Sequence, residues 1–504
     1  MKNNKRLLLG SGLLSLYASG FAADIQGENP NVILILVDDL GKEWIQQYGA
    51  ESIELPNLQR LADESYVFER AYSMPQSTPS RVALLTGQYP YHNGWVNHYD
   101  VPRWGYGAHY DFSQNPCFPR LIKENGYKTC TAGKWQLNDF RLQPDAMVQA
   151  GFDEYCMWTG GEGGNEKISE SRYWDPYIHT KEGSRQYKGS FGPDIYSDFI
   201  VDFITKNKRH PMFIYYPMTL THTPFVHTPH DMAAKTPYEK HRAMVKYTDY
   251  IIGKIMKCLE DNSLKDKTYV IFTTDNGTSA ACVGKRNEQY IRGGKTMLSE
   301  NGINCPFIVH VPGQSKRYQS DALIDFTDLY PTILELTKTK ADKRYLTDGH
   351  SFVPVLNGKK NSVRKWALAM GAHPARIGTD GKVKNQVNFR DRVIIGTNYK
   401  IYVTQQRMID RVYDIVKDPF ELNNLVEDEK ILKRAEKELG NIIKAFPLVD
   451  ANPQYTPLDH NKEWDFPLNE MNEKSKAKRV NYMSVATEQD YIYFIENKNN
   501  KKKK

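Results

Sequence analysis

Apolar residues along this chain gather in short runs that are separated by polar, turn-rich stretches. The two clearest runs, at residues 31–37 and 268–274, are rich in apolar and β-branched side chains, and further strand-like segments lie at 127–132 and 211–218. Continuous runs of this length, without the alternation of a half-exposed strand, are typical of strands buried on both faces of a parallel sheet. The pattern therefore predicts buried strands of an α/β sheet.

Residues 77–87 read Ser-Thr-Pro-Ser-Arg-Val-Ala-Leu-Leu-Thr-Gly and predict a short helix. Thr78 suits the N-cap, a proline follows at the first helical position, and Gly87 ends the helix. Ser77 would then lie at the positive end of the helix, where free N–H groups favour an oxyanion, and Arg81 adds a positive charge one turn further on. On its own, this segment is also compatible with an ordinary capped helix.

The pattern of apolar and polar residues changes after about residue 374. Residues 393–403 and 411–415 predict antiparallel strands joined by Asn-containing turns, and residues 427–446 predict a charged amphipathic helix. Residues beyond about 447 carry no readable motif. The predicted organisation is a signal peptide at 1–23, a large α/β domain at 24–374, a smaller subdomain at 375–450 and an extension with a lysine-rich tail at 451–504.

The first 23 residues have the parts of a secretory signal peptide. Lys2, Lys5 and Arg6 precede a leucine-rich apolar run, and small residues follow it at positions 20–23. We exclude this segment from the fold and expect the chain to be exported. No later stretch reaches the roughly 18 consecutive apolar residues of a membrane span, so we expect no membrane-spanning segment.

The composition is that of an ordinary globular protein, with 25% charged and 40% hydrophobic residues. The net charge of +7 comes partly from the lysine run at 501–504, so we expect no nucleic-acid partner, whereas an anionic substrate is compatible with it. The six cysteines could pair in an exported chain, but they lack the close spacing of a metal site. The sequence leaves disulfide formation open.

Acidic and amide side chains follow the two clearest apolar runs, where each strand should end. Asp38 and Asp39 come directly after the first run, and Asp275 and Asn276 follow the second. Sheets of α/β proteins place ligands at the carboxyl ends of their strands, and two adjacent acids repel each other unless a cation lies between them. Oxygen donors without histidine or cysteine suit calcium or magnesium rather than zinc. Each pair alone could equally be a helix cap or a turn.

Together with the helix at residues 77–87, these pairs resemble the pattern of the type I sulfatases, a family of the alkaline phosphatase superfamily. In that family the residue at the position of Ser77 is a cysteine or serine that is oxidised to formylglycine. The positions that match at the family spacing are Ser77, Pro79, Ser80, Arg81, Thr86 and Gly87. The resemblance runs from about residue 29 to residue 446. It implies a large mixed, mostly parallel sheet sandwiched by helices, with a smaller C-terminal subdomain of a short antiparallel sheet and one helix.

The resemblance also implies a metal centre. Asp38, Asp39, Asp275 and Asn276 are the expected ligands of a divalent cation, commonly calcium and less often magnesium, and modified Ser77 contacts the same ion. The segment Gly-Lys-Trp-Gln-Leu at 133–137 resembles the family's Gly-Lys-Trp-His-Leu, whose lysine and histidine hold the formylglycine and the sulfate.

Lys134 matches this segment, but Gln136 replaces the histidine. Glutamine cannot titrate, so any general-base role of that histidine must move to another residue, and Asp275 is the first candidate.

Two further motifs of the family follow the strands predicted at residues 211–218 and 268–274. His222, in Thr-His-Thr-Pro, resembles the histidine of a His-x-Pro motif that faces the leaving-group oxygen. Residues 292–306 resemble Gly-x-Lys followed by Glu-Gly-Gly-x-Arg-x-Pro. In this segment Lys295, Glu300, Gly302 and Pro306 keep their places, whereas Asn301 and Asn304 depart from the pattern. We expect these two departures to affect local packing rather than chemistry.

The roles implied by the resemblance follow from what a plain serine could not do. Unmodified Ser77 would be trapped as a stable serine sulfate, whereas a hydrated aldehyde can release sulfate without attack by water on sulfur. Arg81 and Lys134 would hold the nucleophile, while His222 and Lys295 would bind sulfate and protonate the departing alcohol. A maturase that accepts serine is then an implied transient partner.

The substrate is predicted from an aromatic stretch that follows the helix at 77–87. This stretch contains Trp95, Tyr99, Trp104, Tyr106 and Tyr110, interleaved with His98, Arg103 and His109. Aromatic faces with polar neighbours suit stacking on sugar rings, although aromatic residues are equally often part of the core. We therefore expect substrate contacts from Gln136, His98, Arg103 and Trp104. With the signal peptide, this predicts a periplasmic bacterial sulfatase that acts on sulfated host or algal carbohydrates.

Two alternatives remain open from the sequence. The first is a phosphatase or phosphodiesterase of the alkaline phosphatase superfamily, which commonly binds two zinc ions through histidines such as His210, His227 and His230 near His222. The second is an inactive glycan-binding relative, which is favoured only by the departures at Gln136 and Asn304. Turnover of an aryl sulfate against an aryl phosphate separates the first alternative, and absence of sulfate release supports the second.

Overall fold

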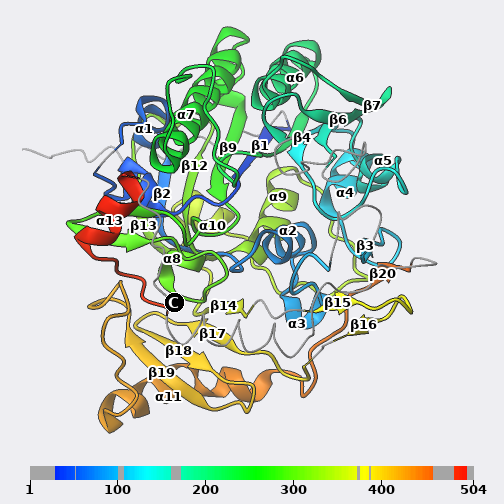
Figure 1. Ribbon diagram of the computed structural model, residues 1–504. Coiled ribbons are helices and arrows are strands. Elements are labelled where there is room, and N and C mark those ends of the chain that lie inside the picture. The colour runs from blue at the N-terminus through cyan, green and yellow to red at the C-terminus, as the bar shows by residue number, and fades with distance from the viewer. Residues whose placement is uncertain are drawn as a thin grey trace, which may run out of the picture.

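The computed structural model describes residues 29–51, 53–99, 107–159, 172–371, 375–384, 387–457 and 482–496. The predicted signal peptide, the predicted contacts Arg103 and Trp104, and the lysine run at 501–504 lie outside these ranges. Figure 1 shows a large unit around a long sheet, with a smaller sheet and one helix below it. No helix among the described residues is long and apolar enough to cross a membrane.

The centre of the large sheet consists of the four strands that the apolar pattern predicts. Strand β1 (Asn31–Val37) lies between β8 (Met212–Pro217) and β9 (Thr268–Thr274) and is parallel to both. Strand β4 (Lys128–Lys134) continues the parallel arrangement on the far side of β8. All seven residues of β1 are buried, as expected for a strand covered on both faces. The prediction of a buried, largely parallel centre is confirmed.

Ten strands form the complete sheet, in the order β13-β2-β12-β9-β1-β8-β4-β5-β6-β7. Strand β12 is antiparallel to both β2 and β9, and β6 and β7 form an antiparallel edge beside β5, so the sheet is mixed. The bounds of the outer strands are β2 Tyr66–Tyr72, β5 Glu154–Trp158, β6 Tyr177–Thr180, β7 Gly183–Gln186, β12 Asn304–His310 and β13 Tyr318–Asp325.

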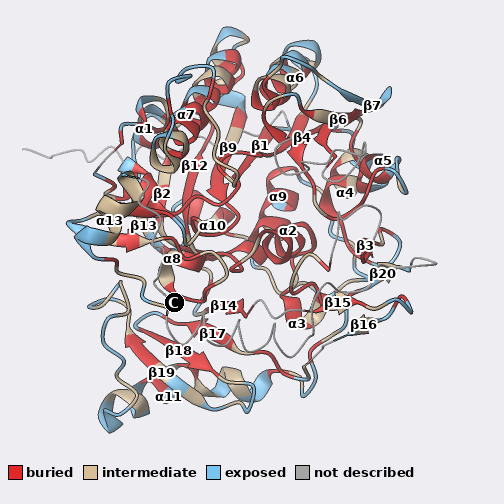
Figure 2. Ribbon diagram, in the orientation of Figure 1, coloured by how far each residue is buried: buried red, intermediate tan, exposed pale blue. Residues whose placement is uncertain are grey.

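Helices cover both faces of this sheet. Successive side chains of β1 point to opposite sides of the sheet, and because all of them are apolar or buried, both faces must be covered. Ile33 and Ile35 belong to the core shared with α1 (Pro56–Asp63), α6 (Gly192–Asn207) and α7 (Pro237–Asp261). Leu34 and Leu36 belong to the core shared with α2 (Ser77–Thr86), α4 (Phe118–Glu124) and α9 (Leu329–Leu336). Figure 2 shows the strands buried between these two layers, with the exposed surface on the outer sides of the helices.

Short elements complete the large unit. They are η1 Lys42–Trp44, η2 Gln46–Tyr48, α3 Pro90–Asn93, α5 Ala146–Ala150, η5 Lys265–Lys267, β10 Val283–Arg286, β11 Gln289–Arg292, α8 Glu300–Ile303, η6 Phe326–Asp328, α10 Val353–Leu356, β15 Arg376–Ile377 and β16 Val383–Lys384. All six cysteines are buried and free, so the pairing that the sequence left open does not occur in this structure.

The smaller unit is a four-stranded antiparallel sheet packed against one long helix, as predicted. Its strands are β14 (Ala367–Met370), β17 (Arg392–Ile395), β18 (Tyr399–Val403) and β19 (Ile409–Asp414), and its helix is α11 (Glu429–Ala445). Strand β14 pairs with β17, so the small sheet begins before the predicted boundary at residue 374. A short apolar run such as Ala-Leu-Ala-Met does not reveal which sheet it joins, because its partner strand β17 does not follow it directly in the sequence.

The extension after residue 450 returns to the large unit. Strand β20 (Tyr455–Thr456) pairs with β3 (His109–Tyr110), and α13 (Glu488–Ile495) packs its aromatic residues against α7 and Trp44 (Figure 1). Between them, residues 482–486 run along β11, where the Arg292 N–H donates to the Ser484 carbonyl at 2.9 Å. The C-terminal segment is therefore part of the structure around the site described next.

Candidate active site

The floor of the site is formed where two neighbouring parallel strands end. The register aligns Val37 of β1 with Thr274 of β9, so the residues that follow these strands lie side by side. Asp39 and Asp275 meet here, because the Asp39 N–H donates to the Asp275 Oδ1 at 3.1 Å. Asn276 joins them by donating from Nδ2 to the Asp39 Oδ1 at 2.7 Å. The structure thus brings the predicted metal ligands Asp38, Asp39, Asp275 and Asn276 together, and all are buried.

Ser77 faces this floor from the first residue of α2. Its hydroxyl lies 3.3 Å from the Asp38 Oδ1 and 3.4 Å from the Asn276 Oδ1. The predicted position at the positive end of a short helix is therefore correct, but the predicted N-cap is wrong. Gln76, not Thr78, is the N-cap, because the helix begins earlier and the Ser80 N–H already bonds to the Gln76 carbonyl.

Three buried or partly buried cations hold the carboxylates of the floor. Lys134, at the end of β4, donates from Nζ to the two Asp38 oxygens at 2.8 and 3.0 Å and to the Ser77 hydroxyl at 3.2 Å. Arg81 donates to the Asp275 Oδ2 at 2.8 Å and to the Lys134 carbonyl at 3.2 Å. Lys295 donates to the Asp39 Oδ2 at 2.6 Å. Each predicted cation therefore contacts a predicted metal ligand.

These contacts set the charge state of the floor. Burial raises the pKa of Asp38, but Lys134, His222, Arg81 and Lys295 outweigh it and hold that pKa well below its ordinary value. Burial and the neighbouring Asp38 raise the pKa of Asp275 to about 6. Burial lowers the pKa of Lys134 to about 8, although Asp38 opposes this shift. Three carboxylates at one buried point thus depend on nearby positive charge.

Asp38 and Asp275 differ in how they lie toward Ser77. Asp275, the expected replacement base, accepts hydrogen bonds from Arg81 at one oxygen and from the Asp39 N–H at the other. Asp38 is the carboxylate whose oxygen lies 3.3 Å from the Ser77 hydroxyl. The structure therefore places Asp38, rather than Asp275, against the Ser77 hydroxyl.

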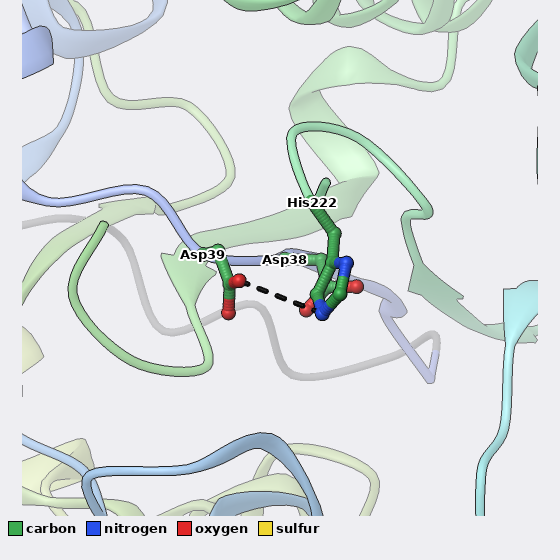
Figure 3. Close-up of side chains that lie close together, drawn as sticks. All are labelled: Asp38, Asp39 and His222. Atoms are coloured by element: carbon green, nitrogen blue, oxygen red, sulfur yellow. Dashed lines mark ion pairs between the residues drawn. The ribbon is translucent and has the colours of Figure 1, made fainter. Parts of the chain in front are cut away.

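His222 lies on the loop after β8 and faces Asp39 (Figure 3). Its Nδ1 lies 2.6 Å from the Thr223 carbonyl, so this nitrogen carries the proton, and Nε2 lies 3.6 Å from the Asp39 Oδ2. Burial, together with the Lys295 ammonium, lowers the pKa of His222 to about 3. The imidazole is therefore neutral at pH 7 and presents an acceptor, and Lys295 is the charged member of the pair that meets at Asp39.

The side chains of the floor fit a hard divalent cation. Asp38, Asp39 and His222 offer ligand atoms within 4.8 Å of one another, and carboxylate and amide oxygens dominate the surrounding donors. Such donors suit calcium or magnesium.

Two of the histidines that could have supported a pair of zinc ions pack on aromatic side chains instead. The His227 ring packs on Trp174, and the His230 ring packs on Tyr247 and Tyr250. Within the described ranges, neither joins a group of residues that could hold a metal ion.

Gln136 departs from the expected motif in its backbone as well as its side chain. It has a φ of 66°, in the left-handed region that residues other than glycine rarely occupy. Its buried Oε1 has no hydrogen-bond partner among the described residues. The side chain therefore keeps an acceptor available two residues after Lys134, which is consistent with the predicted substrate contact.

The aromatic stretch is not a sugar platform where the structure describes it. Trp95, Tyr99 and Tyr110 are each fully buried, with ring centroids 5.7 Å apart for Trp95 and Tyr99 and for Trp95 and Tyr110. His109 is buried as well, whereas His98 is partly exposed. The prediction of stacking on sugars is wrong for these three aromatic residues, because they pack against one another in the core beneath α2.

Arg172 is a site residue that the sequence analysis missed. It is buried, and its Nη1 lies 3.7 Å from the Asp38 Oδ2. Its guanidinium also lies over the Trp158 ring, 4.2 Å from the centroid. An arginine followed by two aromatic residues was the only local signal, and such a run occurs in many cores.

Two family models match this chain. The sulfatase family model matches residues 30–339, and a model of the N-sulphoglucosamine sulphohydrolase C-terminal region matches residues 293–445. The N-acetylgalactosamine-6-sulfatase of Homo sapiens is 32% identical over 367 residues, which cover 67% of each chain. The N-acetylgalactosamine-6-O-sulfatase of Bacteroides thetaiotaomicron is 27% identical over 522 residues, which cover 88% of this chain and all (100%) of that protein.

A solved structure shares the fold. The crystal structure of Ps i-CgsB in complex with k-i-k-neocarrahexaose superposes with a TM-score of 0.70 at 24% identity, covering 86% of this chain and 96% of that chain.

Proposed function

The chain belongs to the sulfatase family and is a sulfuric ester hydrolase, and from this premise we propose that it hydrolyses O-sulfated sugars with a formylglycine made from Ser77 beside a bound calcium ion. The observation that carries the proposal is the convergence on one hydroxyl. Lys134, Asp38 and Asn276 each place a polar atom within 3.4 Å of the Ser77 Oγ. An ordinary structural serine does not need a cation and two metal-type oxygens around it.

Asp38, Asp39, Asp275 and Asn276 are the residues that would hold calcium. When bound, the ion supplies positive charge that favours the ionised form of a neighbouring hydroxyl. The set contains carboxylate and amide oxygens, so calcium or magnesium fits it better than zinc. Lys134 and Lys295 already balance part of the carboxylate charge from the sides.

Oxidation of Ser77 is proposed because plain serine gives a dead end. Its attack on sulfur forms a serine sulfate that needs a second difficult displacement. The hydrate of an aldehyde carries two hydroxyl groups. One oxygen bonds to sulfur as the bond to the departing alcohol breaks, and the other then re-forms the carbonyl and expels sulfate.

The surrounding residues take roles that follow from their contacts. Arg81 is fixed by Asp275 and by the Lys134 carbonyl, so it holds the floor and adds charge behind the nucleophile. Lys134 bridges Asp38 and Ser77 and orients the attacking oxygen.

His222 and Lys295 meet at the Asp39 Oδ2 and form the side of the site that receives the leaving group. Lys295 carries the proton of this pair, and the Nε2 of His222 can relay it to the departing oxygen.

The substrate class rests on the relatives. The two relatives above are named for N-acetylgalactosamine-6-sulfate, and this supports a sulfated carbohydrate as the substrate. The predicted signal peptide supports export to the periplasm, and serine at position 77 supports a maturase that accepts serine. Gln136, His98, Arg103 and Trp104 remain the proposed sugar contacts.

The test compares the rates at which the enzyme hydrolyses sulfate esters with different leaving groups, and compares an aryl sulfate with the matching aryl phosphate. Matured enzyme is offered a panel of defined sulfated monosaccharides and disaccharides, an aryl sulfate and the matching aryl phosphate, and released sulfate and phosphate are measured. We expect sulfate release from at least one sugar and from the aryl sulfate, at rates far above phosphate release. Faster turnover of the aryl phosphate would favour a phosphatase, and binding of sulfated sugars without any sulfate release would favour an inactive glycan-binding relative.

A further inference from the structure

Lys42 is a buried lysine in η1, three residues after Asp39 of the floor. Its Nζ donates to the Glu69 carbonyl on β2 at 2.6 Å and to the Asn304 Oδ1 at the start of β12 at 2.8 Å. Burial lowers the pKa of Lys42 to about 7, but a neutral amine still has two N–H groups, so both bonds persist in either state. The side chain therefore joins the segment after the floor to the residue that follows α8.

Asn304 extends this contact to α8. Its Nδ2 donates to the Glu300 Oε2 at 2.9 Å, so one amide accepts from Lys42 and donates to the first residue of α8. Glu300 also accepts from the Tyr72 hydroxyl at 3.1 Å and from the Lys400 Nζ at 3.0 Å. Burial raises the pKa of Glu300, but Lys400, with smaller contributions that include Lys42, outweighs it and holds that pKa below its ordinary value. The start of α8 is thus held by charge as well as by hydrogen bonds.

The main chain of α8 lies directly against the loop that carries Lys295. A Cβ added at Gly302 would overlap the carbonyl oxygens of Gly294 and Met297, so the two backbones touch without side chains between them. The Gly302 carbonyl also accepts from the Gly277 N–H at 2.9 Å, in the segment that follows the floor. Because close-packed backbones transmit a displacement, a shift of α8 must shift the main chain on either side of Lys295.

We propose that Lys42 is a positioning residue, which holds α8 through Asn304 and so keeps the Lys295 Nζ at Asp39. The inference rests on the proposed function, because Lys295 is given its role in sulfate binding and proton supply there. The Lys295 Nζ lies 2.6 Å from the Asp39 Oδ2 at the end of a flexible side chain, so its position depends on a fixed main chain. A shift of the loop would lengthen this contact without removing any group from the site.

The departure of Asn304 from the family pattern offers a way to test this tie. An arginine, which the pattern has at position 304, could donate to Glu300 and to the Glu69 carbonyl with one fork of N–H groups. Here Lys42 and Asn304 provide these two bonds together. A cavity of about 360 Å³ borders Lys42, Glu300 and Asn304 and leaves room for a longer side chain. The substitution Asn304→Arg should therefore make Lys42 dispensable.

The experiment breaks the tie at each of its two members and then restores it. Lys42→Met and Asn304→Leu are each made with and without Lys295→Met, and Lys42→Met/Asn304→Arg is the rescue variant. All proteins are matured in the same way and assayed well below their unfolding temperatures. The comparison with and without Lys295 separates an effect through this lysine from a general loss of stability.

The matched control is Lys254→Met. Lys254 also has two partners, the Ser197 Oγ at 3.0 Å and the Asp198 Oδ1 at 2.5 Å, but it lies on α7. Turnover numbers are measured with an aryl sulfate, and calcium content is measured by elemental analysis. The rate at which an amine-reactive ester labels Lys295, followed by peptide mass analysis, reports its position without any need for activity.

We expect turnover of Lys42→Met to fall by about 10- to 100-fold, because a displacement of about 1 Å in a positioned group can cost this much. Labelling of Lys295 should become severalfold faster, since Asp39 holds its ammonium less well. When Lys295 is already methionine, the loss of Lys42 should have little further effect on turnover. Lys42→Met/Asn304→Arg should recover most of both properties, Lys254→Met should match the wild type, and calcium content should stay unchanged.

Unchanged turnover and unchanged labelling of Lys295 in folded Lys42→Met would overturn the inference. An equal loss of turnover with and without Lys295 would also overturn it, because Lys42 would then stabilise the fold and not act through that lysine. If Lys42→Met does not fold, Asn304→Leu decides by the same two comparisons. Failure of the wild-type enzyme to hydrolyse any sulfate ester would instead contradict the proposed function, and the labelling rates would still decide the inference.

Discussion

Two parts of the active site are held by different kinds of contact. One is the floor, which contains Asp38, Asp39, Asp275 and Asn276. The other is a wall, which consists of the loop after β11 that carries Lys295 and of residues 482–486 beside it. Asp38 and Asp275 directly follow paired strands, so the ladder between β1 and β9 fixes their main chains. Lys295 lies on the loop after β11, and residues 482–486 run along that strand from the far end of the chain. The Tyr482 hydroxyl contacts the carbonyls of Arg292 and Gly293, at 3.2 and 3.0 Å, close to this lysine.

This difference separates two ways of losing activity. A substitution in the floor removes a charge or ligand, because the sheet keeps the remaining main chain in place. A substitution in the wall leaves the chemical groups intact but lets Lys295 move, because its loop is held by individual hydrogen bonds, such as that from the Lys295 N–H to the Thr278 carbonyl at 2.9 Å, and not by the ladder of a sheet. Effects should therefore be large and tied to metal content in the floor, and smaller and independent of metal content in the wall.

The largest effect is expected from Asp39→Ala in the floor. This variant removes a carboxylate that contacts Asn276, Lys295 and, more distantly, His222, and the remaining oxygens leave too little charge to hold calcium. We expect turnover to fall by at least roughly 1000-fold, together with calcium content. Asp63→Ala, at an exposed position of α1, is the control. Full activity of Asp39→Ala, or of chelated metal-free enzyme, would contradict the metal assignment.

A smaller loss, which depends on the leaving group, is expected from His222→Ala. If His222 relays a proton to the departing oxygen, its loss should slow sulfated sugars by about 100-fold or more. Nitrophenyl sulfate should be affected much less, because its leaving group needs no proton. Rates with a series of leaving alcohols of increasing pKa measure this dependence. Equal losses on good and poor leaving groups would exclude His222 from proton transfer.

A change in stability, with a pH dependence, is expected from Glu43→Gln beneath the loop that joins floor and wall. Glu43 is buried, and burial raises its pKa to about 7 although Thr278 and Arg286 oppose this shift. Because the folded pKa lies above the ordinary value of 4.5, the wild-type protein loses stability as the pH rises from about 4.5 through 7.

Glutamine cannot ionise, so the variant should avoid that loss. We expect Glu43→Gln to be more stable than wild type by about 1 to 3 kcal/mol at pH 8, with no such gain at pH 4.5. Chemical denaturation at both pH values measures the difference, with Glu54→Gln at an exposed position as the control. An equal change in stability at both pH values would show that Glu43 does not titrate between them.

The smallest effect is expected from Tyr482→Phe in the wall. The change removes a hydroxyl that also lies 2.5 Å from the Asn301 side chain, but it keeps the ring in place. We expect a fall in turnover of only a few-fold, because about 1 kcal/mol of hydrogen bonding is lost. Calcium content should be that of the wild type. Loss of calcium in this variant would break the distinction between floor and wall.

The buried centre of the fold and the floor of the site could be predicted from the sequence for a physical reason. Strands covered on both faces leave continuous apolar runs, and the polar residues that follow such strands stand out against them. Asp38, Asp39, Asp275 and Asn276 were found in this way, and the segment around Ser77 matched a family signature. These signals are local, so contacts between distant residues are not needed to read them.

The rest depended on distant contacts. The aromatic residues Trp95, Tyr99 and Tyr110 have polar neighbours in sequence, and only the folded chain shows that they are buried. Arg172 reaches Asp38 from a segment without a motif, and residues 482–486 lie far from β11 in sequence. The neutral state of His222 likewise follows from burial and from Lys295, which no local pattern reveals.

The central claim, that Ser77 is converted to formylglycine, is tested most directly by peptide mass analysis of active enzyme. Protein made with a serine-accepting maturase and protein made without it are digested, and the peptide that contains Ser77 is compared between them. We predict that the active preparation carries residue 77 lighter by two hydrogen atoms, or as the hydrate of that aldehyde, and that the preparation with plain serine is folded but nearly inactive. Sustained turnover by a preparation in which every Ser77 is unmodified serine would contradict the claim.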